Sequence, residues 1–68
     1  MKFNKNHPVQ VRVSRNCILV ASRTDDFSSR QEIRSWINST LRNRFPNKKV
    51  TVDVVNDNNY ISWTQIVG

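Results

Sequence analysis

The sequence predicts an α+β fold of order β-β-α-β-β, a four-stranded, mainly antiparallel sheet with one helix packed on one face. Three observations predict it. Two stretches at each end have the composition of strands, the stretch between them has helical spacing, and turn residues separate them. With 68 residues the chain forms one domain, 1–68, in which we expect residues 1–7 to be a loosely ordered lead-in.

The first two strands are predicted to form a hairpin. Val9 to Val13 places three valines on one face and polar residues on the other, which is typical of a half-buried strand. The run from Cys17 to Ser22 is apolar on both faces, which favours a central strand with a buried thiol at Cys17. Between the two runs, Ser14–Asn16 predicts a loop of roughly three residues.

A helix is predicted after a loop over 23–27. Ser28 and Ser29 each have Gln or Glu three residues later, which is the capping-box spacing. The helix should run to about Arg44, because Pro46 disfavours helical geometry in the residue before it. Its apolar face comprises Ile33, Trp36, Ile37, Thr40, Leu41 and Phe45.

The second hairpin follows the helix. Lys49 to Val55 alternates, 56–59 is a turn rich in Asn and Asp, and Tyr60 to Val67 is the last strand. One helix covers only one face of a sheet, so the other face must meet solvent or a ligand. Alternation predicts that this face displays Gln10, Arg12, Thr51, Asp53, Tyr60, Ser62 and Thr64.

Several classes of protein are not supported. We find no apolar run long enough to span a membrane and no apolar segment of a secretory signal near Met1, so we expect a cytoplasmic protein in a reducing compartment. One Cys and one His cannot build a structural zinc site, so no metal or cofactor is predicted. No catalytic residues are predicted either, because Gly68 is the only glycine and no carboxylate pair lies in a predicted cleft. We therefore expect a protein that is not an enzyme.

The charge is strongly basic and unevenly distributed. Eleven Lys and Arg against five Asp and Glu give a net charge of +6. Segments 1–23 and 33–49 each carry five cations and no acid, so they form a strong positive patch if they meet in space. The residues predicted to contact nucleic acid or an acidic partner are Arg12, Arg15, Arg23, Arg42, Arg44, Lys48, Lys49 and, by stacking, Tyr60. A second candidate surface, for a partner, is the polar helix face of Ser35, Asn38, Ser39 and Asn43.

Two functions are consistent with these features. The first is a small nucleic-acid-binding module, with RNA or single strands favoured, that neutralises phosphates. The alternative is a non-enzymatic inhibitor or adaptor that binds an acidic protein surface, such as a small viral or mobile-element protein that blocks a host enzyme. A chain this short has a thin core, so a homodimer is one way in which it could gain stability.

Overall fold

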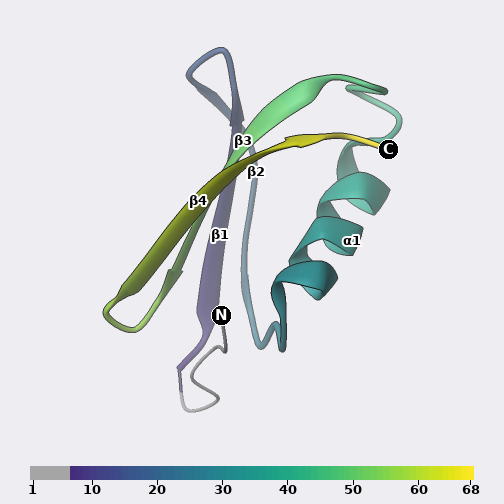
Figure 1. Ribbon diagram of the computed structural model, residues 1–68. Helices are drawn as coiled ribbons and strands as arrows, with labels where there is room; N and C mark the ends of the chain where they lie inside the picture. Colours follow the sequence, from purple (N-terminus) through teal and green to yellow (C-terminus); the bar gives the residue numbers. More distant parts are fainter. Residues whose placement is uncertain (1–6) are drawn as a thin grey trace.

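The computed structural model describes residues 7–68, and the first six residues of the predicted lead-in lie outside the described residues. Four strands and one helix follow one another in the predicted order (Figure 1). They are β1 (Val9–Arg15), β2 (Ile18–Asp25), α1 (Arg30–Leu41), β3 (Lys49–Asn56) and β4 (Asn59–Ile66).

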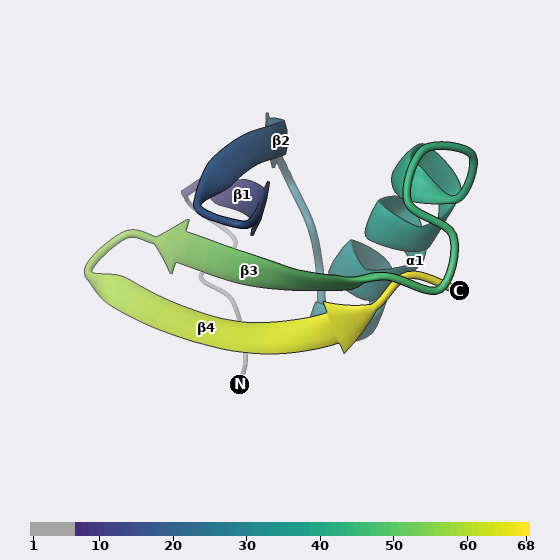
Figure 2. The ribbon, with the colours of Figure 1, turned by 90° about the horizontal axis from the view of Figure 1, so that it is seen from above.

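All four strands form one open sheet in the order β2-β1-β3-β4, and every neighbouring pair is antiparallel. Figure 2, a view from above, shows α1 on one side of this sheet, with no element on the other side in the part of the chain that is described. The predicted fold class is therefore confirmed. Within residues 7–68, α1 is too short to cross a membrane.

The core lies between α1 and the sheet. Alternate residues of β1 and β3 are valines with almost no exposed surface, and the helix covers them with Ile33, Ile37 and Leu41. Phe27, before α1, and Val67, after β4, complete the core. The apolar face of the strands, with a period of two residues, thus packs against the apolar face of the helix, with a period of 3.6 residues. This packing buries both faces.

The prediction of a central second strand was wrong. β2 is an edge strand, and Ile18 and Leu19 keep 67% and 57% of their surface exposed. It also extends to Asp25, over residues predicted to be a loop. An apolar run can be buried on both faces or remain exposed at an edge, and composition alone does not distinguish the two.

The first turn is shorter than predicted. It consists of Asn16 and Cys17, with φ angles of 54° and 65°, the pattern of a type I′ turn in a two-residue hairpin. Cys17 is consequently exposed, and the prediction of a buried thiol was wrong. The second turn is also shorter than the predicted 56–59, because Asn56 is the last residue of β3. The buried side chain of Asn56 donates hydrogen bonds to the carbonyls of His7 and Pro8 at 3.1 and 3.5 Å.

The capping box predicts the start of the helix correctly. The Ser29 hydroxyl accepts a hydrogen bond from the Glu32 N–H at 3.3 Å, and the Glu32 carboxylate accepts one from the Ser28 N–H at 3.0 Å. The helix ends at Leu41, three residues earlier than predicted, and Thr40 of the predicted apolar face is exposed. A tighter segment follows, in which the N–H groups of Arg44 and Phe45 both reach the Leu41 carbonyl.

Candidate nucleic-acid interface

Cations from three separate segments meet at one end of the molecule. Arg15, just before the first turn, donates a hydrogen bond to the carbonyl of Lys49 at the start of β3, at 2.9 Å. Arg44, beyond the helix, donates one to the carbonyl of Val20 in β2, at 3.4 Å. We call this region the basic end and define it by Arg15, Arg42, Arg44, Lys48 and Lys49.

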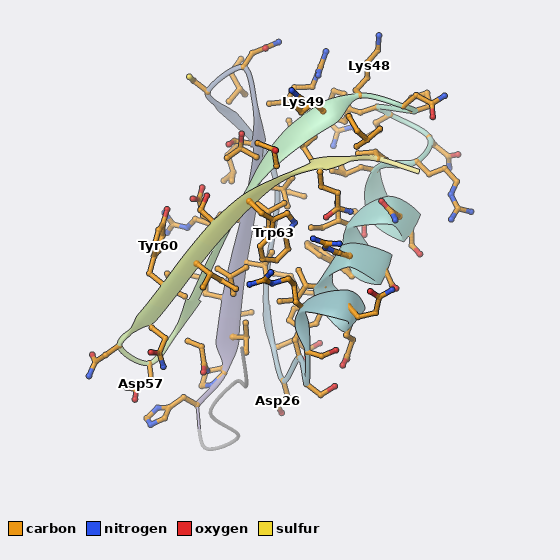
Figure 3. The ribbon with its side chains drawn as sticks, viewed as in Figure 1. Asp26, Lys48, Lys49, Asp57, Tyr60 and Trp63 are labelled. Atoms are coloured by element: carbon orange, nitrogen blue, oxygen red, sulfur yellow. The ribbon has the colours of Figure 1, made fainter. Side chains whose placement is uncertain are left out.

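Acidic residues are concentrated at the opposite end. Figure 3 shows Lys48 and Lys49 at the top of the molecule, and Asp26 and Asp57 at the bottom. The topology explains this, because β2 and β3 both run away from the basic end towards those carboxylates. Among residues 7–68 the ion pairs are Arg23 with Asp25 and His7 with Asp57, so none involves the basic end.

The structure does not bring every predicted cation to this end. Arg12 lies in the middle of β1 on the open face, the sheet face directed away from α1. Arg23 lies on the helix side, with its guanidinium 5.3 Å from the Phe27 ring centre and 5.8 Å from that of Trp36. Its hydrogen bond to Asp25, together with the larger effect of the Asp26 N–H, lowers the pKa of that carboxyl.

The open face carries a shallow hollow around Tyr60, whose side chain is 63% exposed. Its volume is about 290 Å³, and Gln10, Arg12, Asp53, Val55 and Tyr60 line it. The Tyr60 hydroxyl donates a hydrogen bond to the Asp53 carboxylate at 2.5 Å, which raises the pKa of Tyr60 above its ordinary value. The ring is thus held in place beside Asp53, whose charge offsets that of Arg12 in the neighbouring strand.

The predicted polar helix face is partly used within the fold. The Asn38 side-chain oxygen accepts hydrogen bonds from Gln65 at 3.0 Å and from the Gly68 N–H at 3.1 Å. Ser35, Ser39 and Asn43 remain exposed. A groove of about 430 Å³ separates this side of α1 from β4, and it is lined by Gln31, Arg34, Ser35, Asn38, Thr64, Gln65 and Ile66.

Two features of the surface were not predicted. Arg30 and Arg34, one helical turn apart, place their guanidinium groups 5.3 and 5.8 Å from the Trp63 ring centre. Trp36, predicted on the apolar face of the helix, and Trp63 are half-buried and pack against the core. The second feature is the set of exposed apolar side chains at the sheet edges, Ile18, Leu19 and Ile66. The i, i+4 spacing of the two arginines was visible in the sequence, but their contact with β4 depends on tertiary packing.

No group of three or more metal-ligating side chains occurs among residues 7–68. No family model matches the chain, and no curated protein or solved structure matches it significantly. Function must therefore be inferred from the chemistry of the surface.

Proposed function

We propose that this protein is a small nucleic-acid-binding module that binds the phosphate backbone of RNA or a single strand through the basic end. The observation that supports the proposal is the convergence of Arg15, Arg44 and Lys49 from distant segments at an end with no carboxylate partner among the described residues. Guanidinium groups suit bidentate contacts to phosphate, and Arg supplies three of the five cations at this end.

Lys48 and Lys49 are the most informative members of the basic end. A cation at the C-terminus of a helix has an ordinary explanation in the helix dipole, and this covers Arg42, the C-cap residue of α1. The two lysines lie beyond the helix and are exposed, and neither forms an ion pair with residues 7–68. Desolvating them against phosphate therefore breaks no internal ion pair in the described part of the chain.

Tyr60 and Arg12 have a secondary role in this proposal. Lys49 shares the open face with Asp53, which lies four positions further along β3, about 13 Å away. A single strand that leaves the basic end along this face can reach the Tyr60 ring and stack on it. Base stacking on an aromatic ring contributes about 1–3 kcal/mol per base and tolerates any sequence.

The proposal is tested by reversing the charge at the basic end and, as a control, on the helix surface. Lys48→Glu with Lys49→Glu should weaken binding to single-stranded RNA roughly tenfold or more at fixed salt, similarly for all sequences, because phosphate contacts carry no sequence information. The matched control is Arg30→Glu with Arg34→Glu, which changes the net charge equally on the helix surface. Fluorescence anisotropy with labelled oligonucleotides measures both affinities.

The control should lose much less affinity than the lysine variant. If the two double variants weaken binding equally, only net charge matters and the assignment to the basic end is wrong. Circular dichroism of each variant, compared with that of the unmodified protein, verifies that the sheet and helix are retained.

A protein-binding role is the second candidate, and the exposed edge of β2 favours it. Ile18 and Leu19 present apolar surface beside unpaired backbone groups, which a strand of another protein can extend. The basic end would then contact an acidic surface of that partner. Lysate treated with nuclease separates the candidates, since a stoichiometric protein partner that survives the treatment supports this role.

A further inference from the structure

The β4 strand itself carries none of the sequence features that usually prevent strands from pairing between molecules. Edge strands are commonly protected by charged residues, prolines or bulges. β4 (Asn59–Ile66) contains no charged residue and no proline, and its register with β3 is unbroken. The other edge strand, β2, carries Arg23 and Asp25, and a register shift interrupts its pairing with β1.

The hairpin register determines which backbone groups of β4 point outward. Asn56 and Asn59 close a two-residue loop and therefore form a hydrogen-bonded pair, and such pairs alternate along an antiparallel ladder. Trp63 then points its N–H and C=O towards β3. The residues that direct these groups to the free edge are Tyr60, Ser62, Thr64 and Ile66.

We propose that β4 pairs with β4 of a second copy of this chain, antiparallel and centred on Trp63, so that two sheets join into one. In this register Ser62 lies opposite Thr64 of the second copy, and Tyr60 lies opposite Ile66. The residues that direct backbone groups outward thus meet one another, as the ladder requires. Any register shifted by one residue would instead place inward-directed groups at the interface.

The exposed apolar side chains of β4 match this symmetry. Tyr60 and Ile66 are 63% and 55% exposed, lie on the same face and are equally distant from Trp63. By the two-fold symmetry, Tyr60 of each copy lies opposite Ile66 of the other, so the pair occurs twice. Aromatic–aliphatic pairs across strands are favourable. A single pairing therefore gives an apolar neighbour to both of the large apolar side chains that β4 leaves exposed.

The charges at the two ends of β4 favour the second copy, and they act against the repulsion between the Arg30 and Arg34 pairs that both copies bring to the Trp63 axis. Ile66, at the end of β4, lies beside Lys49 of the same chain. Antiparallel pairing places this end next to the start of β4 in the second copy, which follows Asp57, so opposite charges come closer together. The basic ends then lie at opposite ends of the dimer. The groove between α1 and β4 lies where the second copy's Ile61 would enter, opposite Gln65.

The test is the mass of the protein in solution. Sedimentation equilibrium between about 1 μM and 1 mM protein should show a concentration-dependent shift from the 8.0 kDa monomer to twice that mass. Ile66→Lys should raise the dimer dissociation constant at least tenfold. Leu19→Lys, an equally exposed apolar residue on the other edge strand, adds the same charge and should leave the constant within twofold.

Thr64→Pro provides a second variant, because proline removes an N–H that faces the free edge and spares the bonds to β3. It should keep the circular dichroism spectrum and sediment as a monomer. A wild-type protein that stays monomeric at about 1 mM would overturn the proposal, as would equal effects of Ile66→Lys and Leu19→Lys.

The register has its own test in a Cys17→Ser background. Ser62→Cys protein mixed with Thr64→Cys protein should form a mixed disulfide under mild oxidation at least tenfold faster than either protein alone forms its own. Equal rates in all three samples would contradict a pairing centred on Trp63.

Discussion

At the scale of the residue, the positive φ angles among residues 7–68 occur where the sequence supplies Asn or Asp, with one exception. Asn16, Asn47 and Asp57 have φ angles of 54°, 59° and 58°, in the left-handed region that these side chains tolerate. Cys17 has a φ of 65° and no such tolerance. The requirement for a two-residue turn therefore imposes backbone strain at Cys17.

Cys17→Gly should consequently stabilise the protein. Glycine adopts positive φ without steric cost, and Asn-Gly is the preferred pair for a type I′ turn. The relieved strain, partly offset by the greater entropy of the unfolded chain, should raise the free energy of unfolding by about 0.5–1 kcal/mol. Chemical denaturation measures it. A Cys17→Ala variant, which removes the thiol but keeps a Cβ, should show no comparable gain.

At the scale of the element, the start of the helix depends on the protonation state of Glu32. Hydrogen bonds from Ser28, first from its hydroxyl at 2.5 Å and then from its N–H, lower the pKa of Glu32 below its ordinary value of 4.5. Because the pKa is lower in the folded state, ionised Glu32 stabilises the fold above pH 4.5, and this stabilisation is lost as the pH falls through the folded-state value.

Glu32→Gln should therefore flatten the acid limb of the stability profile. Thermal unfolding at a series of pH values from 7 to 3 should show a smaller loss of stability below about pH 4.5 in the variant than in the unmodified protein. Asp25, whose pKa is also lowered, remains in both proteins and contributes equally. Identical pH profiles would show that the Glu32 hydrogen bonds do not contribute to stability.

The elements themselves follow from local patterns, whereas their order in the sheet does not. Alternation in β1, β3 and β4, the apolar run in β2 and the capping box at Ser29 were sufficient to predict four strands and a helix. The apolar run in β2 suggested a central strand, yet β2 lies at an edge. Strand order depends on which pairs bury the most surface against the helix, and this is a property of the whole chain.

The candidate site divides in the same way. The cations of segment 33–49 predicted that Lys48, Lys49 and Arg44 could act together. Only the fold shows that Arg15 joins them and that Arg23 does not. The pairing of β1 with both β2 and β3 brings Arg15 beside Lys49. Arg23 lies two residues from the end of β2, near the acidic end, where aromatic rings and Asp25 hold it.

At the scale of the whole molecule, charge is polarised from one end to the other. The molecule measures 33 × 21 × 17 Å, and the cations of the basic end lie at the end opposite Asp26 and Asp57. Under the proposed function, such a distribution would orient the protein as it approaches a polyanion, because the basic end is attracted most strongly. Orientation of this kind depends on salt, since screening shortens its range to about 8 Å at physiological ionic strength.

The most direct test of the nucleic-acid proposal is fluorescence anisotropy of the unmodified protein with single-stranded RNA, single-stranded DNA and duplex DNA, each titrated across salt. If the basic end binds phosphates and unpaired bases stack on Tyr60, the affinity for RNA or a single strand should exceed that for duplex. The logarithm of the binding constant should fall linearly with that of the salt concentration, with a slope of about −3 for four to five contacts to a single strand. Weak binding that disappears by physiological salt, with no preference among the three, would contradict the proposal.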